Sequence, residues 1–173
     1  SPVYPETDTL WELAQDVDIT YFGTSAAYIH ACMQANLRPK EKFNLLKLKG
    51  LGSTGAPLPP EGFNWVYDYV NRDMLLGSVS GGTDVCTAFV GSCPLLPVRS
   101  GEIQCRCLGA KVEAYDGAGA SLVNAVGELV LTEPLPSMPL FFWNDPGNVH
   151  LRESYHETYK GIWRHGDWIK ITD

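Results

Sequence analysis

The first part of the chain alternates between helical and strand-like patterns of apolar residues. A helix is expected after Asp8, which can cap its first turn. Its apolar face consists of residues at helical spacing: Leu10, Leu13, Ala14 and Val17. The next segment, DITYFGTS, has the composition of a strand that ends at Gly23, and Ser25 can cap a second helix from Ala26 to about Ala35.

The same alternation continues to about residue 93. A short leucine-rich strand, LLKLKGLGS, leads through a Pro-rich turn to a helix with Pro60 in its first turn. One face of this helix is apolar: Phe63, Val66, Tyr67 and Val70. The apolar stretch before SVSGG supplies another strand. Residues 1–93 are therefore expected to form an α/β portion, with helices packed on part of a mostly parallel sheet.

From about Pro94 the pattern changes to short strands separated by turns. Strands are expected in GEIQCRCLG, AKVEAYDGAGASL, VGELVLTEP and GIWRHGDWIKITD, and Asp116-Gly117 is a hairpin signal. Helical periodicity is weak, so residues 94–173 predict a small strand-rich lobe with a distorted β-barrel. The cluster Phe141-Phe142-Trp143 is expected in the core of this lobe.

Composition and charge exclude several classes of protein. The chain has 173 residues, 45% of them hydrophobic, which is enough for one domain or two closely packed lobes. No apolar run reaches the ~20 residues that a membrane span needs. The net charge is −7 and the basic residues are scattered, which argues against nucleic-acid binding through a basic face. We expect a soluble globular protein that binds anions locally, through backbone amides or magnesium.

The five cysteines favour a reducing, cytosolic setting, because the chain has neither a Cys-x-x-Cys pair nor an N-glycosylation sequon. The pair Cys105-Arg-Cys107 could be half of a metal site or two inward positions of a strand. The histidines are not spaced to complete a metal site, so strand alternation with Ile103 is the preferred interpretation. No zinc site is predicted.

Three turns rich in Gly, Ser and Thr follow the predicted parallel strands. They are Gly23-Thr24-Ser25, Gly52 to Pro57, and Ser80 to Asp84. Ligands of open α/β sheets bind outside the carboxyl ends of the strands. Glycines let backbone N–H groups approach an anion, and hydroxyls add donors. Each turn alone could be an ordinary one, but together they predict a nucleotide or acyl site.

The order of five segments resembles that of the motifs of the adenylate-forming enzymes, which include acyl-CoA synthetases, firefly luciferase and peptide-synthetase adenylation domains. The segments are YFGTSAAYIHA, LKGLGSTGAPLPPEGFNWV, SVSGGTDV, GELVLTEPLPSMPLFFWND and WRHGDW, which together span nearly the whole chain. Their wording is most similar to the acetoacetyl-CoA synthetase family. The resemblance implies an ATP-dependent ligase that adenylates a short 3-oxo acid, such as acetoacetate, and transfers it to CoA.

The resemblance places a phosphate loop at residues 80–84. It implies that Ser80, Gly82 and Thr83 bind the nucleotide, with Gly82 keeping the turn tight and Thr83 donating its hydroxyl and amide to the adenylate α-phosphate. Asp84 stands where the family has Glu, so the resemblance implies that it helps to hold magnesium. Because Asp is shorter than Glu, contact with the metal through a water molecule is the safer expectation. Thr83 and Asp84 are the catalytic candidates; the alternative for Asp84 is a cap of the following segment.

Two further motifs imply contacts to the nucleoside. Gly55-Ala56-Pro57 match the turn whose backbone lies against adenine, where only small residues leave room for the base. Asp167 matches the aspartate that accepts hydrogen bonds from both ribose hydroxyls. It is the last of the predicted nucleotide-binding residues along this chain. His165 replaces the commoner threonine, with a structural role preferred over a catalytic one. Trp163 can be core or pocket wall.

The resemblance also implies an acyl pocket lined by Gly23, Thr24 and Gly81. Acetyl-CoA synthetases carry Trp at the position of Gly81, so a glycine frees space for a larger acid. Glu128, in the family's Gly-Glu-Leu strand, would have a mainly structural role.

Several family elements are expected outside this chain: an upstream lysine-bearing loop that grips the ATP β- and γ-phosphates, a hinge, and a C-terminal domain with a further lysine. The chain alone is therefore expected to bind adenylate weakly and to turn nothing over. Three alternatives stay open: another short- or medium-chain acyl-CoA ligase, a non-enzymatic AMP-binding module, and a purely structural lobe.

Overall fold

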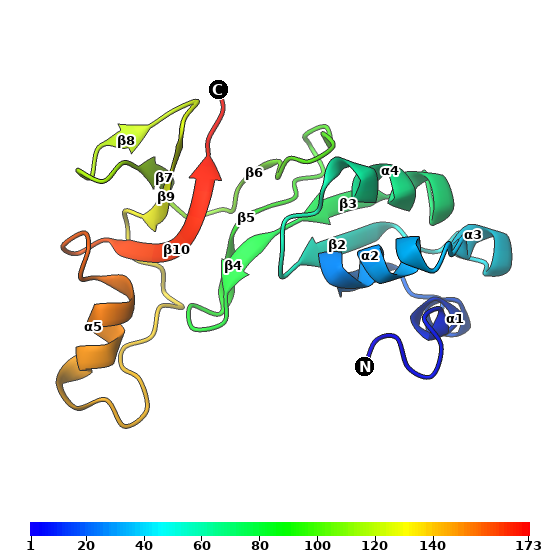
Figure 1. Ribbon diagram of the computed structural model, residues 1–173, viewed down its shortest axis with the longest axis horizontal. Helices are drawn as coiled ribbons and strands as arrows, with labels where there is room; N and C mark the ends of the chain where they lie inside the picture. Colours follow the sequence, from blue (N-terminus) through cyan, green and yellow to red (C-terminus); the bar gives the residue numbers. More distant parts are fainter. The chain divides into compact units, whose positions relative to one another are not determined.

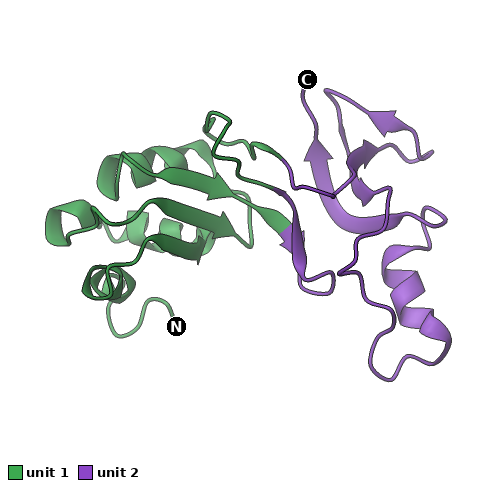
Figure 2. Ribbon diagram, turned by 180° about the vertical axis from the view of Figure 1, so that it is seen from behind, with its two compact units in different colours: residues 1–80, 91–105 green, residues 81–90, 106–173 purple.

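The computed structural model describes all residues from 1 to 173, which fall into two compact units (Figure 2). Unit 1 contains residues 1–80 and 91–105, and unit 2 contains residues 81–90 and 106–173. The two units interleave along the sequence. None of the helices has the length and apolar character that crossing a bilayer requires.

Unit 1 is built on three parallel strands in the order β1-β2-β3 (Figure 1). They are β1 (Tyr21–Ser25), β2 (Gly50–Thr54) and β3 (Leu75–Ser78). The predicted parallel sheet is thus confirmed. Strand β1 continues past Gly23, because Thr24 and Ser25 still pair with residues of β2.

Four helices belong to unit 1. They are α1 (Thr9–Asp16), α2 (Ala26–Gln34), α3 (Pro39–Lys42) and α4 (Pro60–Tyr69). Ser25 caps α2 as predicted, since its hydroxyl accepts the Tyr28 N–H at 3.2 Å. The side chain of Asp8 does not cap α1 and forms an ion pair with Lys42 instead. Pro60 opens α4, where its missing N–H leaves no helical bond unmade.

The helices bury one face of this sheet. Phe22, Leu51 and Leu76 occupy aligned positions of the three strands and are at most 7% exposed. They form one apolar cluster with side chains of the three longer helices, including Trp11, Ile29, Cys32, Phe63 and Val66. This core fixes the strands, and so it fixes the turns that leave their carboxyl ends.

Unit 2 contains an open antiparallel sheet in the order β10-β9-β7-β8. The strands are β7 (Val112–Tyr115), β8 (Ser121–Leu122), β9 (Val126–Leu131) and β10 (Trp163–Lys170). The predicted strand-rich character is confirmed, but the expected barrel is not closed, because β10 and β8 are edges. The hairpin at Asp116 is confirmed as well, since its carboxylate accepts two backbone N–H groups of the turn at 2.9 Å.

A second small sheet has the order β4-β5-β6. Its strands are β4 (Ser80–Gly82), β5 (Thr87–Gly91) and β6 (Cys105–Arg106). The strand expected over GEIQCRCLG is reduced to two residues, so alternation of Ile103, Cys105 and Cys107 along one strand is not observed.

A helical segment that the sequence pattern did not predict precedes β10. It consists of the 3-10 turn η1 (Pro146–Asn148) and α5 (Val149–Tyr155). Asp145 is buried, and its carboxylate accepts the backbone N–H groups of His150 and Leu151, both at 3.0 Å. Burial by itself raises the pKa of Asp145, but these donors outweigh it and hold the pKa below its usual value. A single side chain, rather than periodicity, therefore starts this helix.

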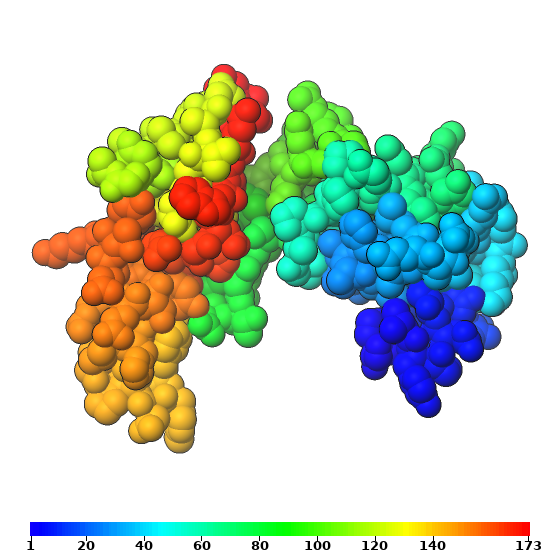
Figure 3. All heavy atoms as spheres, in the orientation of Figure 1, coloured from blue at the N-terminus to red at the C-terminus, as the bar shows by residue number.

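The prediction that Phe141-Phe142-Trp143 lies in the core is wrong. Phe141 is 65% exposed and Trp143 is 95% exposed, in a yellow-orange segment that lies on the surface of unit 2 (Figure 3). Phe142 packs edge-on to the ring of Tyr155 with a centroid distance of 6.3 Å. These residues are in a loop, so no sheet face holds all three inward.

Candidate functional site

The predicted phosphate loop is the turn between β4 and β5. The Thr83 carbonyl accepts the Cys86 N–H at 3.1 Å, which closes a four-residue turn. Cys86 has a φ of 51°, in the left-handed region. Val85 is completely buried and anchors the turn, whereas Thr83 and Asp84 are exposed. The turn thus presents a hydroxyl and a carboxylate to solvent.

Both glycines of this loop are required by close packing. A Cβ on Gly81 would meet the carbonyl oxygen of Thr87 and lie 2.6 Å from the Cα of Ala88. A Cβ on Gly82 would lie 2.9 Å from Cε1 of His165. Close packing of the hairpin backbone therefore explains the glycine at position 81 without any ligand. The role of Gly81 in sizing an acyl pocket stays a prediction.

Asp167 lies in a bulge of β10. The register places the three residues between Arg164 and Trp168 opposite one residue of β9. Gly166 has a φ of 92°, which a residue with a side chain rarely adopts. The side chain of Asp167 is 58% exposed. The bulge therefore turns this carboxylate out of the ladder.

Glu128 holds the bulge from the neighbouring strand β9. Its Oε1 accepts the Gly166 N–H at 3.0 Å, and its Oε2 lies 3.2 Å from Nε of Arg164. The side chain is only 11% exposed, so both oxygens of a nearly buried carboxylate are paired. Sequence reasoning assigned Glu128 a structural role without these contacts. The available signal was an acid within an otherwise apolar strand.

His165 links the phosphate loop to the predicted ribose aspartate. Its Nε2 lies 3.2 Å from the Gly81 carbonyl oxygen and 3.6 Å from Oδ2 of Asp167. Its Nδ1 accepts the indole N–H of Trp163 at 3.4 Å. Because an indole N–H can only donate, Nδ1 is the unprotonated nitrogen of the ring. The proton is therefore on Nε2, and Nε2–H donates a hydrogen bond to the Gly81 carbonyl. The ring packs edge-on against Phe89, and these contacts support the structural interpretation of His165.

Asp84 is contacted from a different element, the end of α5. The hydroxyl of Tyr155 donates to Oδ2 of Asp84 at 2.5 Å. Burial and this bond raise the pKa of Tyr155 to about 12, so the hydroxyl keeps its proton at neutral pH. The tyrosine ring stacks on Trp163, with centroids 3.7 Å apart and an interplanar angle of 11°. Trp163 is 1% exposed, which places it in the core of unit 2.

The residues predicted for adenine lie in unit 1, as do two of the three predicted for the acyl group, Gly23 and Thr24, whereas Gly81 belongs to unit 2. Gly55-Ala56-Pro57 follow β2 and are exposed, and the φ of 84° at Gly55 turns the chain away from the strand. Gly23 is exposed on β1, and a Cβ there would meet nothing within 4 Å. Thr24 and Ser80 are partly exposed. Their roles toward adenine and the acyl group stay predictions.

The same sheet carries a row of aligned hydroxyls, of which the sequence prediction named only Thr24 as a site residue. Thr24, Ser53 and Ser78 occupy aligned positions of the three strands. Ser53 is completely buried, and its hydroxyl has no hydrogen-bond partner. A buried hydroxyl without a partner destabilises a fold, so Ser53 is an energetic weak point of unit 1.

The donors for a magnesium ion are few. No group of three or more His, Cys, Asp and Glu side chains is placed to hold a metal ion. Magnesium usually keeps several waters and is bound by one or two carboxylates together with substrate phosphates. The exposed carboxylate of Asp84 fits the role of one such carboxylate ligand, because only one of its two oxygens is bonded to Tyr155.

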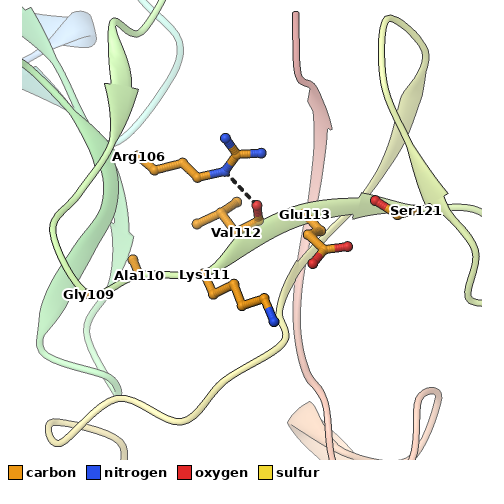
Figure 4. A pocket seen from close by; sticks show the side chains of 7 residues that line it. All are labelled: Arg106, Gly109, Ala110, Lys111, Val112, Glu113 and Ser121. Carbon is orange, nitrogen blue, oxygen red and sulfur yellow. Dashed lines mark hydrogen bonds between the residues drawn. The ribbon is translucent and has the colours of Figure 1, made fainter. Parts of the chain in front are cut away.

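A depression in unit 2 lies apart from these residues (Figure 4). It has a volume of about 660 Å³ and is lined by Arg106, Gly109, Ala110, Lys111, Val112, Glu113 and Ser121. The guanidinium Nε of Arg106 donates to the Val112 carbonyl at 2.7 Å, so this charge is partly committed to the fold. None of the predicted site residues lines the depression.

The sequence is similar to curated acetoacetyl-CoA synthetases over almost its full length. It is 41% identical to the protein from Gallus gallus over 171 residues and 41% identical to that from Rhizobium meliloti over 172 residues. Each match covers 99% of this chain and 26% of the relative. The chain thus spans about a quarter of the length of these relatives. No family model matches it.

Two solved structures are similar to the fold. Acetoacetyl-CoA synthetase from Streptomyces lividans matches with a TM-score of 0.91 at 47% sequence identity, over 100% of this chain and 27% of that chain. An anthranilate CoA ligase in complex with anthranoyl-AMP matches with a TM-score of 0.78 at 15% identity, over 95% of this chain and 30% of that chain. At so low an identity, the second match shows a shared fold alone.

Proposed function

We propose that this chain, a homologue of one segment of the acetoacetyl-CoA synthetases among the adenylate-forming enzymes, supplies part of the adenylate-binding site of an acetoacetate–CoA ligase. One observation in unit 2 supports the site most directly. His165 bonds to the carbonyl of Gly81 and lies beside Asp167, so the phosphate loop and the ribose aspartate are neighbours. Two motifs that are far apart in the sequence thus come together as a shared nucleotide site requires.

In the proposed first step, the carboxylate of the acid attacks the α-phosphorus of ATP, and pyrophosphate leaves. Thr83 donates its hydroxyl and amide to the α-phosphate, where negative charge develops. Asp167 accepts hydrogen bonds from the ribose hydroxyls and thereby orients the nucleotide. Asp84 contributes a carboxylate to magnesium, which would offset phosphate charge when bound. In the second step, the thiol of CoA displaces AMP.

Unit 1 would contribute the adenine turn, Gly55-Ala56-Pro57, and the acyl-pocket residues Gly23 and Thr24. The exposed, side-chain-poor backbone of the turn supports contact with a flat base. The remaining part of a larger ligase would supply lysines for the phosphates and the CoA site. The five cysteines, none of them in a Cys-x-x-Cys pair, support a reducing, cytosolic setting for the enzyme.

The test is acid-dependent exchange of labelled pyrophosphate into ATP, measured on the complete protein that carries this chain. We expect exchange with acetoacetate to exceed exchange with acetate or butyrate. Thr83→Ala removes a donor to the reacting phosphate, so its kcat should fall about 100-fold. Thr87→Ala, an exposed threonine of the same hairpin outside the turn, is the matched control and should retain the wild-type rate.

Absence of exchange with every 3-oxo acid would refute the ligase. Wild-type exchange by Thr83→Ala would refute the assignment of the phosphate loop. Exchange that is faster with a straight-chain acid than with acetoacetate would leave the assignment of the phosphate loop intact. The substrate would then be another short- or medium-chain acid.

A further inference from the structure

The loop between Gly81 and Asp84 is held at both of its ends by side chains from other elements. Between these ends lie Gly82 and Thr83, and the Thr83 side chain is exposed. A donor on an exposed turn is useful to a reaction only if the turn keeps one conformation. The contacts at the two ends therefore decide how well Thr83 is positioned.

At the carboxyl end of the loop, the Tyr155 hydroxyl donates to Oδ2 of Asp84 at 2.5 Å. This is a hydrogen bond to a charged acceptor, which is stronger than a bond between neutral groups. Tyr155 is the last residue of α5, and the start of α5 is fixed in turn by the buried carboxylate of Asp145. The anchor is thus attached to an ordered element.

At the amino end of the loop, Nε2–H of His165 donates to the Gly81 carbonyl at 3.2 Å. The imidazole is 12% exposed and packs edge-on against Phe89 with centroids 4.6 Å apart. Gly82 has no side chain in the space that this ring occupies. The ring and the loop therefore fit each other closely.

Trp163 connects the two anchors. Its ring stacks on Tyr155, and its indole N–H donates to Nδ1 of His165 at 3.4 Å. Trp163 pairs with Leu131 in the regular part of the β9–β10 ladder, before the bulge begins. A rigid strand residue thus orients the ring of one anchor and sets the tautomer of the other.

We propose that Tyr155, Trp163 and His165 form a clamp that positions the phosphate loop for its reaction. They are positioning residues, because they act through Gly81 and Asp84 rather than on the nucleotide. The catalytic consequence rests on the proposed function, whereas the ordering of the loop does not.

The ordering of the loop is tested by limited proteolysis of the complete protein with a protease that cleaves on the amino side of aspartate. Tyr155→Phe removes one hydroxyl and keeps the ring stack, so cleavage before Asp84 should accelerate about tenfold. Tyr159→Phe is the matched control, since its hydroxyl donates to the Asp116 carbonyl at 2.9 Å in a different turn of unit 2. It should accelerate cleavage before Asp116 and leave Asp84 unchanged.

The catalytic consequence is tested by pyrophosphate exchange. Tyr155→Phe should lower kcat about tenfold and change KM for ATP less than twofold, because an ordered donor matters most in the transition state. His165→Gln keeps an amide that can donate to Gly81, so it should retain more activity than His165→Phe, which keeps only the ring packing. In the wild type, ¹⁵N NMR should show His165 as the Nε2–H tautomer.

These results separate the two claims. If no acid supports exchange, the proposed function fails, and cleavage before Asp84 still decides the clamp. Equal cleavage before Asp84 in wild type and Tyr155→Phe would overturn the clamp, as would an Nδ1–H tautomer of His165. Equal kcat in wild-type and Tyr155→Phe enzyme would overturn its part in catalysis.

Discussion

The two units fix the positions of their predicted ligand-binding turns by different means. In unit 1, the turn at Gly55 follows a paired strand, and its position depends on backbone pairing and on the apolar face beneath the sheet. In unit 2, the turn at Thr83 and the bulge at Asp167 are held by side-chain hydrogen bonds from His165 and Glu128. Turns of the first kind depend on the whole core. Turns of the second kind depend on a few polar atoms.

This difference leads to separate expectations for substitutions. Loss of apolar volume in unit 1 should lower the free energy of unfolding and affect all of its turns together. Loss of a single polar atom in unit 2 should change one turn or bulge and leave most of the fold intact.

The largest effect is expected from the core of unit 1. Phe63 is 2% exposed and belongs to the apolar cluster beneath the sheet. Phe63→Ala should lower the free energy of unfolding by about 3–5 kcal/mol, measured by urea denaturation. Leu46→Ala, at a residue that is 76% exposed, should change it by less than about 0.5 kcal/mol. Similar losses in both variants would contradict the position of this core.

A smaller effect is expected at the bulge of unit 2. Glu128→Ala leaves the Gly166 N–H and the Arg164 guanidinium without their partner, which should cost about 1–3 kcal/mol of unfolding free energy. The KM for ATP should rise with it, because Asp167 sits on that bulge. Glu133→Ala breaks an exposed pair with Lys111 and should cost at most about 1 kcal/mol, with KM unchanged. An unchanged KM in Glu128→Ala would show that the bulge does not present Asp167 to the nucleotide.

A pH-dependent effect is expected at the start of α5. Because the folded-state pKa of Asp145 lies below its unfolded value, its contribution to stability is complete above the unfolded pKa. That contribution is lost as pH falls through the lower, folded-state pKa. The protection factors of the α5 amides, that is, their exchange rates relative to those of an unfolded chain at the same pH, should therefore fall on acidification below about pH 4. Asp145→Asn should remove this dependence, whereas Glu153→Gln, an exposed residue of the same helix, should keep it.

The smallest effect has the opposite sign. Ser53→Ala removes a buried hydroxyl that has no partner, so it should raise the free energy of unfolding by up to about 1 kcal/mol. Ser25→Ala removes the cap of α2 at the same edge of the sheet and should lower it by about 1 kcal/mol. Thermal unfolding of the two variants compares them directly, and a destabilised Ser53→Ala would indicate that the hydroxyl is hydrogen-bonded in solution.

Much of unit 1 could be predicted from the sequence, because its signals are local. Ser25 caps the helix that follows it, Pro60 opens the next one, and the strands carry their own apolar patterns. Helix α5 was missed because its start depends on Asp145, whose partners lie five and six residues further on. The exposed Phe141 shows that aromatic residues in a loop do not identify a core.

The candidate site was predictable only in part. Motif order located Thr83, Asp84 and Asp167, which the structure presents on an exposed turn and an exposed bulge. The contacts of His165 and Glu128 could not be predicted, because they depend on the register between β9 and β10 and on the length of the bulge. Register and bulges are properties of the paired strands, and neither strand carries them alone.

The central claim is that Asp167 and the neighbouring loop bind the AMP moiety of an adenylate. Equilibrium binding of AMP to the complete protein tests it most directly, with Asp167→Ala compared with wild type and with Asp68→Ala, an exposed aspartate of unit 1. Loss of charged hydrogen bonds to the ribose should raise the Kd about 10- to 100-fold in Asp167→Ala alone. The same Kd in wild type and Asp167→Ala would contradict the account.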